Sequence, residues 1–214
     1  MRGSNKIFII GLPRTGTTSV CAAMLDLGFR VAHTAYTDRT FTDAQVIADT
    51  PVFCDYQLLD IAFPNAKFIY LERNLTNWLP SIAQLLARMH VNLVRDDGGF
   101  NPIIKRCYQT IFAPYSLSNS QDFAFLSQCY QQHQAQAQSY FNGRVDDFLS
   151  IDISAPLSYQ QLLTFLNVTP PQSNQQGFEK LNVGGKVTAW KDIKSPRKIE
   201  STNKGRVTKL PYLK

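Results

Sequence analysis

The sequence contains no long apolar run. Its hydrophobic stretches fall well short of the roughly 18 to 20 residues that a membrane-spanning helix needs. Residues 7–10, the first apolar segment, are also too few for the core of a signal peptide. We therefore expect a cytoplasmic protein without a membrane span.

Cysteines are few and are not arranged in pairs. The four of them are Cys21, Cys54, Cys107 and Cys129, and they show no C-x-x-C or zinc-finger spacing. Such spacing is typical of metal sites and redox motifs. We expect reduced thiols rather than a disulfide framework, and no bound metal.

Charged residues are also scarce, at 18% of the chain against 44% hydrophobic residues, which is typical of a folded protein rather than a disordered one. A length of 214 residues suits a single domain, which we expect over residues 5–214. The net charge is +6, but the Lys and Arg residues crowd residues 186–214 instead of following a helix with aromatic residues between them. A multiply charged nucleotide accounts for this charge, and we expect no nucleic-acid partner.

The most informative stretch lies near the N-terminus. The apolar residues 7–10 lead into Gly11, then Gly16, and then into an amphipathic segment. This order predicts a buried strand, a glycine-containing turn and the first turn of a helix, where backbone N–H groups and the helix dipole converge on an anion. The residues expected to bind a phosphate there are Gly11, Pro13, Arg14, Thr15, Gly16, Thr17, Thr18 and Ser19.

The lysine of an NTP-binding P-loop is missing from this stretch. In the pattern GxxxxGK[ST], Thr17 stands at the lysine position and Thr18 at the hydroxyl position. NTPases use that lysine against the β- and γ-phosphates, so its absence disfavours ordinary ATP or GTP chemistry. Arg14 is the nearest replacement cation, which suits a 5′-phosphate that carries a terminal anionic group.

The segment PRTGTTS, residues 13–19, resembles the 5′-phosphosulfate loop of sulfotransferases that use 3′-phosphoadenosine 5′-phosphosulfate (PAPS). In that family the loop typically reads PK[ST]GTT, or PRSGTT in some branches. A second segment, FIYLERNLTNWLPS at residues 68–81, is similar to the family's 3′-phosphate motif Arg-x7-Ser, here Arg73 and Ser81. Two motifs in the right order are much more specific than one. The resemblance covers residues 6–90 well and the rest loosely.

Other interpretations of the second segment come from its residues alone. Arg73 is of a type that often forms surface ion pairs, and Glu72 at the end of the same predicted strand is placed like an acid that positions a metal. A metal-positioning role for Glu72 is disfavoured, because the P-loop lysine that would accompany it is absent.

Predicted strands and helices alternate along the chain. We expect strands at residues 29–32, 51–54, 67–71 and 148–153, and a short helix or loop at residues 37–49. Helices are expected at residues 56–63, from residue 78 onwards, and at 102–113, 121–140 and 157–166. The pattern predicts a three-layer, P-loop-like α/β domain with a central parallel sheet of about five strands. We expect a helical insertion around residues 84–145 to bind the acceptor.

Two residues are candidates for a general base. His33 follows the strand predicted at residues 29–32, at the sheet edge where ligands bind in open α/β folds, although a histidine bonded to nearby backbone fits equally well. Asp55 follows the strand predicted at residues 51–54, where it is placed either for catalysis or as the N-cap of the next helix. The resemblance implies a His or acidic base near this edge, with Asp55 slightly ahead.

Residues 184–191, GGKVTAWK, faintly resemble the RKGxxGxWK segment that folds over the nucleotide in this family. Gly185, Trp190 and Lys191 match, Lys186 is offset, and the Arg-Lys pair is absent. The resemblance implies that Gly185 and Lys186 contribute to the nucleotide site.

The resemblance implies transfer of a sulfuryl group from PAPS, without a metal, to a hydroxyl or less favourably an amine of a small molecule, lipid or glycan. It implies that Arg14 neutralises charge on the leaving phosphate, that Thr17 and Thr18 bind phosphate oxygens, and that Arg73 and Ser81 hold the 3′-phosphate. Two other classes stay open. A P-loop kinase-like phosphotransferase would turn over ATP with magnesium, and a non-catalytic nucleotide-binding protein would bind without transfer.

Overall fold

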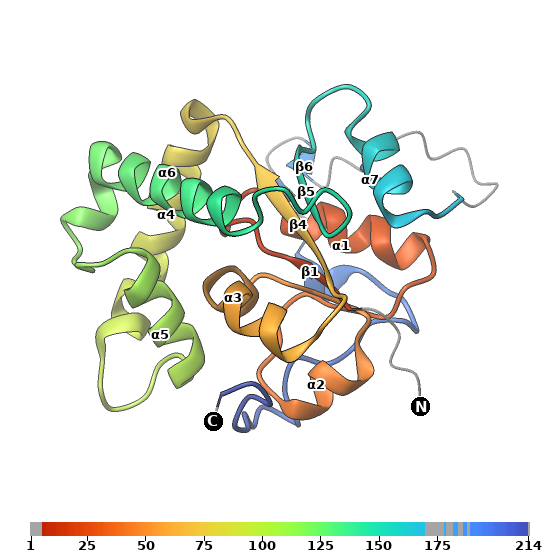
Figure 1. The fold of residues 1–214 in the computed structure, drawn as a ribbon. Helices are drawn as coiled ribbons and strands as arrows, with labels where there is room; N and C mark the ends of the chain where they lie inside the picture. Colours follow the sequence, from red (N-terminus) through yellow and green to blue (C-terminus); the bar gives the residue numbers. More distant parts are fainter. Residues whose placement is uncertain (1–5, 170–177, 179–181, 184–185, 188, 214) are drawn as a thin grey trace.

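The structure is a computed structural model that describes residues 6–169, 178, 182–183, 186–187 and 189–213 (Figure 1). Within this part of the chain, a parallel sheet is formed by β1 (Ile7–Ile9), β2 (Val31–Ala32), β3 (Val46–Ala48), β4 (Lys67–Glu72) and β5 (Phe148–Asp152). The strand order is β2-β3-β1-β4-β5. β1 is central, with Ile9 beside Ala48 of β3 and beside Ile69 of β4. The predicted parallel sheet is confirmed, and the carboxyl ends of its strands meet at one edge.

Helices cover both faces of the sheet. In the described residues they are α1 (Thr17–Asp26), α2 (Asp38–Asp43), α3 (Val52–Ala62), α4 (Leu75–Val94), α5 (Pro102–Ile111), α6 (Phe123–Tyr140) and α7 (Ser158–Leu166). α1 and α7 pack against Ile7 and Ile9, whereas α2 and α3 pack against Phe8 and Ile10. β1 is apolar throughout because successive residues of a strand face opposite sides and both sides are buried here. None of these helices is long and apolar enough to cross a membrane.

α4, α5 and α6 lie together beyond the carboxyl end of β4 (Figure 1). All three come from the chain between β4 and β5, where the helical insertion is predicted. Their buried side chains cluster around Trp78, together with Leu12 of the β1–α1 loop and Phe53 of α3. This cluster fixes the three helices against the loop that follows β1.

The prediction of a strand at residues 51–54 is wrong. These residues lead into α3, and the strand beside β1 is β3, within a segment for which we expect a short helix or loop. Val52 and Leu59 are both buried on α3, and a short apolar run fits a buried helix as well as a buried strand. Residues 52–54 therefore belong to a helix, and the strand beside β1 ends at Ala48. The other predicted strands and helices are present, with ends that shift by about a turn at most.

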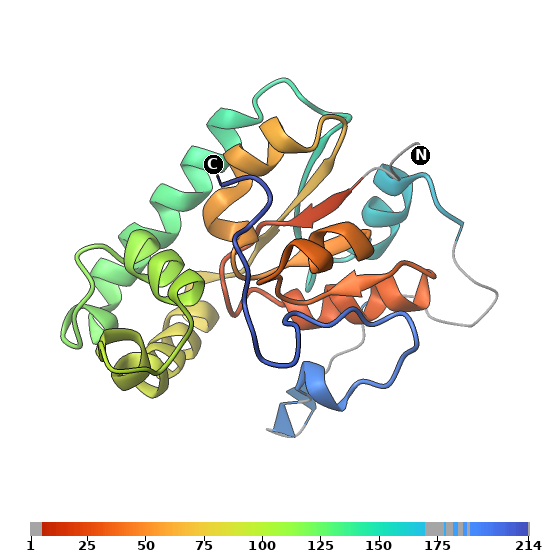
Figure 2. The ribbon, with the colours of Figure 1, turned by 90° about the horizontal axis from the view of Figure 1, so that it is seen from below.

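The C-terminal residues run along the outer edge of β2 (Figure 2). Val31 donates its backbone N–H to Arg197 O at 3.0 Å and accepts from the Ile199 N–H at 2.9 Å. Further along, Leu210 is buried, and Tyr212 packs edge-on against Phe41 of α2. We call residues 189–213 the C-terminal strap. It covers a strand edge that would otherwise present unpaired backbone groups.

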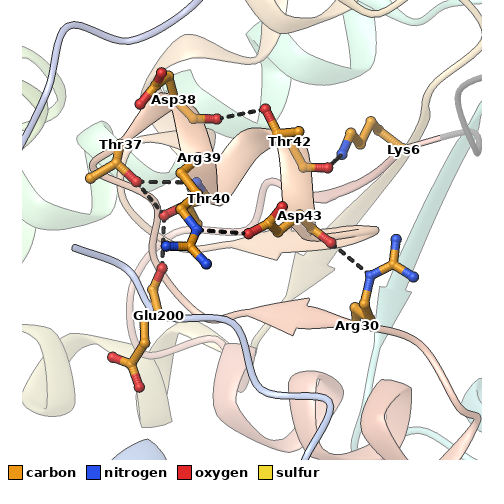
Figure 3. A network of polar contacts seen from close by, with 9 residues as sticks. All are labelled: Lys6, Arg30, Thr37, Asp38, Arg39, Thr40, Thr42, Asp43 and Glu200. Atoms are coloured by element: carbon orange, nitrogen blue, oxygen red, sulfur yellow. Dashed lines mark hydrogen bonds and ion pairs between the residues drawn. The ribbon is translucent and has the colours of Figure 1, made fainter. Parts of the chain in front are cut away.

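A polar network fastens α2 to the strap and to β2 (Figure 3). Thr37 caps α2 by accepting the Thr40 N–H at 3.1 Å, and the Thr40 hydroxyl donates to Glu200 O of the strap at 2.7 Å. At the other end of the helix, Arg30 Nε donates to Asp43 O at 2.8 Å. The strap and α2 therefore form one hydrogen-bonded unit at this edge of the sheet.

Candidate active site

The loop between β1 and α1 and the first turn of α1 contain most of the predicted phosphate-binding residues, and we call residues 11–19 the phosphate loop. It passes so close to β4 that a Cβ atom on Gly11 would lie 2.6 Å from the Leu71 Cβ. Gly16 has a φ of 104°, and a Cβ atom there would meet the end of the Ile153 side chain. Packing against β4 therefore requires Gly11, and the left-handed backbone favours glycine at position 16.

Helix α1 begins directly after Gly16, and its first turn is open. No side chain in the described residues caps it, and the turn contains no acidic residue. The backbone N–H groups of Gly16, Thr17, Thr18 and Ser19 have no acceptor in the described part of the chain, because the first N–H groups of a helix lack partners inside it. Together with the helix dipole they form a site for an anion.

Two residues of the phosphate loop make contacts that support the loop itself. Thr15 is buried, and its hydroxyl donates to Leu12 O at 2.7 Å. The Pro13 carbonyl accepts a hydrogen bond from the indole Nε1 of Trp78 at 2.9 Å. Their polar groups are thus bonded within the protein, and a direct contact of Thr15 or Pro13 with a ligand stays a prediction.

Arg14, Arg73 and Ser81 come together beside the phosphate loop. Arg14 Nε donates to Ser81 Oγ at 2.8 Å, and Arg73 donates from its guanidinium to Arg14 O. Burial lowers the pKa of Arg14 below its ordinary value, and the charges of Arg73 and Arg88 lower it further. Because an anion would offset both the repulsion and the desolvation of these cations, the cluster favours an anionic ligand.

Arg73 is held at the end of β4 by the helical region. Its backbone N–H donates to the hydroxyl of Tyr130 on α6 at 2.8 Å. Burial lowers the pKa of Arg73, and the charge of Asp152 acts against that effect. In the described residues Arg73 forms no ion pair within 4 Å, so its surface ion-pair interpretation finds no partner there.

His33 follows β2, and its Nε2 faces the phosphate loop. Nε2 lies 3.0 Å from Thr18 Oγ1 and 3.3 Å from Thr17 Oγ1. Burial lowers the pKa of His33 below its ordinary value of 6.5, so the ring is neutral at pH 7. His33 therefore reaches the anion site through the hydroxyls of two threonines.

Asp49 is a residue of the site that the sequence analysis misses. It directly follows β3, and Ala48 of β3 pairs with Ile9 of β1, so Asp49 lies beside the start of the phosphate loop. Its Oδ1 accepts from the N–H and the hydroxyl of Thr50 at 2.7 and 3.0 Å. No described residue donates a hydrogen bond to Oδ2. Asp49 therefore presents a free carboxylate oxygen at the sheet edge.

The charge of Asp49 acts on side chains from several elements. It raises the pKa of Arg14 and of His33, which opposes the lowering that burial causes. It also raises the pKa of Tyr36 and of Tyr108, in the same direction as burial. The signal in the sequence is an apolar run, Val46–Ala48, that ends at a carboxylate. A strand of three residues is too short to show a clear period.

Asp55 does not stand at the end of a strand, which corrects its predicted position. It lies inside α3 at a kink where its own φ of −109° and ψ of 15° are not helical. Its buried carboxylate accepts from Arg106 at 2.8 and 2.6 Å, and Oδ2 also accepts from the Tyr212 hydroxyl at 2.8 Å. No described helix N–H donates to it, so it forms no N-cap. These contacts tie α3 to α5 and to the C-terminal strap.

Two predicted nucleotide-binding residues cannot be placed. Gly185 lies outside the described residues. Lys186 belongs to β7 (Lys186–Val187), which pairs with β6 (Asn182–Val183), but its side chain is not described. A role for either residue stays a prediction. Among the described residues, no three His, Cys, Asp or Glu side chains are grouped to hold a metal ion.

The chain matches a known family over most of its length. The family model described as a sulfotransferase domain matches residues 6–37 and 34–187. These ranges include the phosphate loop, Arg73, Ser81, His33 and Asp49. No curated protein matches the chain. PAPS is the sulfuryl donor that this family implies, and the open first turn of α1 beside clustered guanidinium groups fits such an anionic nucleotide. Because the matched ranges cover more than half of the sequence, this protein belongs to the sulfotransferase-domain family.

Proposed function

We propose that this protein transfers the sulfuryl group of PAPS to a hydroxyl group of an acceptor, and that Asp49 takes the acceptor proton. One observation carries the proposal: an open helix N-terminus without the P-loop lysine lies next to the Arg14, Arg73 and Ser81 cluster. PAPS carries a 5′-phosphosulfate and a 3′-phosphate, and it has no γ-phosphate for a lysine to hold. Its two anionic ends therefore match the two kinds of site.

In this proposal the phosphate loop binds the 5′ end of the donor. The first N–H groups of α1 and the hydroxyls of Thr17 and Thr18 hold the 5′-phosphosulfate. Arg14 neutralises the charge that grows on the bridging oxygen as the sulfuryl group leaves. Arg73 and Ser81 hold the 3′-phosphate. The bond from Arg14 Nε to Ser81 Oγ supports this division, because it brings together one residue from each of the two sequence motifs.

Asp49 is the base that the contacts favour. Its Oδ2 has no hydrogen-bond donor among the described residues, and it stands where β3 ends beside the phosphate loop. A general base must reach the acceptor hydroxyl and must have a lone pair free to receive its proton. Asp55, the base first expected, has both oxygens engaged by Arg106 and Tyr212. His33 directs Nε2 at the loop threonines instead.

The acceptor is a small molecule, a lipid or a glycan, and we propose that the helices around residues 84–145 contact it. Tyr108 of α5 supports this assignment, because it packs edge-on against Phe53 with ring centroids 5.8 Å apart. Phe53 in turn donates its backbone N–H to Asp49 O at 3.2 Å. One residue of the helical region thus lies close to the proposed base.

Calorimetry tests the donor. We expect PAPS and its desulfated product, 3′-phosphoadenosine 5′-phosphate (PAP), to bind much more tightly than ATP and without added magnesium. Labelled PAPS is then incubated with a panel of alcohols, phenols, sugars and amines, and sulfated products are measured.

Two other results would point to other classes. Magnesium-dependent turnover of ATP would identify a kinase-like phosphotransferase. Tight binding of PAPS with no transfer to any member of the panel would favour a nucleotide-binding protein without catalysis.

A further inference from the structure

One side chain connects the phosphate loop to the C-terminal strap. His33 Nε2 lies within 3.0 and 3.3 Å of the hydroxyl oxygens of Thr18 and Thr17. The imidazole ring also stacks on the indole of Trp190, with ring centroids 5.5 Å apart and the planes inclined by 29°. The histidine is therefore bonded at its edge and covered on one face.

Trp190 is itself held in place by Lys198 of the strap. Lys198 Nζ lies 4.7 Å from the centre of the indole ring, a cation–π arrangement. The same ammonium group donates to Trp190 O at 2.6 Å and to Ile193 O at 2.8 Å. Lys198 is part of the strap segment that follows the edge of β2, so this edge of the sheet supports the stack.

We propose that His33 is a positioning residue that turns the hydroxyl protons of Thr17 and Thr18 toward an anion in the phosphate loop, and that Trp190 of the C-terminal strap holds it there. The proposal rests on the proposed function, which puts the 5′-phosphate of a nucleotide in this loop. It gives the strap a part in donor binding although no strap residue needs to touch the donor.

The reason lies in how a hydroxyl group shares its proton. A threonine oxygen has one proton to donate and lone pairs that accept. If Nε2 carries a proton, it donates to a threonine oxygen, and the threonine proton is free to point at a phosphate oxygen. If Nε2 lacks a proton, it accepts the threonine proton and withdraws it from the ligand. A bound phosphate therefore selects the form of His33 that is protonated at Nε2.

Two charged groups act on His33 besides the loop itself. Burial lowers its pKa, Lys198 lowers it as well, and Asp49 works in the opposite direction. A doubly charged phosphate in the loop adds negative charge beside the ring, which raises the pKa of His33 in the complex. Binding of the nucleotide is then accompanied by proton uptake on His33.

Calorimetry with PAP tests the proposal, since PAP has the same 5′-phosphate and needs no acceptor. We expect His33→Leu to weaken PAP binding about tenfold, because it removes the hydrogen-bond partner of both threonines. His33→Gln places an amide near Nε2 and should stay within about threefold of the wild type. His90→Gln is the matched control. His90 lies on α4, its ring stacks on that of Tyr115 with the centroids 5.8 Å apart, and it contacts no phosphate-loop residue in the described structure. This variant should bind PAP as tightly as the wild type.

The pH dependence separates positioning from simple support of the fold. The ratio of the PAP dissociation constants of His33→Gln and wild type should rise as the pH falls from about 8 to about 6, because only the wild type takes up the extra proton. Titrations in two buffers with different ionisation enthalpies should show more proton uptake for the wild type. A ratio that is independent of pH would contradict the proton uptake, and His33→Leu binding PAP as tightly as the wild type would overturn the proposal.

The stack is tested with Trp190→Leu and Trp190→Phe. We expect the leucine variant to weaken PAP binding in the same direction as His33→Leu, and the phenylalanine variant to keep most of the affinity because a ring still covers His33. Thermal melts confirm that each protein is folded. If both variants bind PAP like the wild type, the strap has no part in donor binding. If the wild type itself does not bind PAP, the proposed function fails, whereas equal binding by all variants refutes only this inference.

Discussion

Arg14 Nε donates a hydrogen bond to Ser81 Oγ over 2.8 Å, although 67 residues separate the two in the chain. The contact joins the phosphate loop to the second turn of α4. Because Arg73 also donates to Arg14 O, the residues assigned to the two phosphates of the donor form one hydrogen-bonded frame. Arg14 therefore contacts both residues that we propose for the 3′-phosphate.

Replacing Arg14 should affect turnover more than binding. The guanidinium is expected to meet charge that develops only as the sulfuryl group leaves, and loss of one such donor typically costs about a hundredfold in rate. We expect Arg14→Ala to lower turnover by about that factor and to weaken PAPS binding less. Single-turnover kinetics with labelled PAPS give both quantities. Unchanged turnover would remove Arg14 from the catalytic residues.

Arg73 should distinguish PAPS from adenosine 5′-phosphosulfate, which lacks the 3′-phosphate. Hydrogen bonds to a charged group contribute about 1.5 to 3 kcal/mol each, so Arg73→Ala should weaken PAPS by roughly ten- to a hundredfold. The weaker binding of adenosine 5′-phosphosulfate should hardly change. Ser81→Ala should act in the same direction more mildly, and less than additively with Arg73→Ala.

Competition calorimetry with the two nucleotides measures the contrast. Equal weakening of both would mean that Arg73 acts mainly through its bond to Arg14 O, as a support of the phosphate loop.

Asp49→Asn should leave donor binding intact and lower turnover. The amide cannot take a proton from the acceptor, so we expect turnover to fall by about a hundredfold or more while PAP binding stays near that of the wild type. Sulfated product from labelled PAPS is measured per folded protein. Near-normal turnover would exclude Asp49 as the base.

Asp55→Asn is the matched control, with the opposite expected result. It removes a carboxylate that is 3% exposed from a partner, Arg106, that is 40% exposed. Water screens the exposed arginine, so we expect a loss of about 2 kcal/mol of stability, below the usual cost of breaking a fully buried pair. Chemical denaturation measures this loss. If the variant is as stable as the wild type but inactive, Asp55 rather than Asp49 is the base.

His133 of α6 is buried and neutral, which links the stability of the fold to pH. Its Nε2 lies 2.8 Å from Phe53 O, which only accepts, so Nε2 carries the proton. Nδ1 then accepts from the Tyr70 hydroxyl at 3.2 Å. Burial lowers the pKa of His133 to about 4.

We expect the free energy of unfolding to fall as the pH drops from about 6.5 toward 4, because the unfolded chain takes up a proton on this histidine and the folded protein does not. The full loss from His133 is about 3 kcal/mol. Urea denaturation near neutral pH and near pH 4.5 measures it, with His133→Gln in parallel. The variant should show a shallower decline, and an identical decline in both proteins would contradict this account.

The sequence by itself determined the phosphate loop and the general architecture. A strand, a turn with two glycines and a helix follow one another in adjacent residues, so their geometry depends mainly on local conformation. The strand that ends at Arg73 and the helix that contains Ser81 are likewise continuous in the sequence. Their periods and motifs are therefore visible without any knowledge of which distant residues touch.

The tertiary structure alone decided which carboxylate stands at the sheet edge. Residues 46–48 and 51–54 are both short apolar runs followed by an aspartate, and neither is long enough to show the period of a strand or a helix. Pairing with β1 selects the first run as the strand, so Asp49 lies beside the phosphate loop while Asp55 pairs with Arg106. The same holds for His33 and Trp190, whose contact joins two distant segments of the chain, because a contact of this kind depends on the packing of the whole fold.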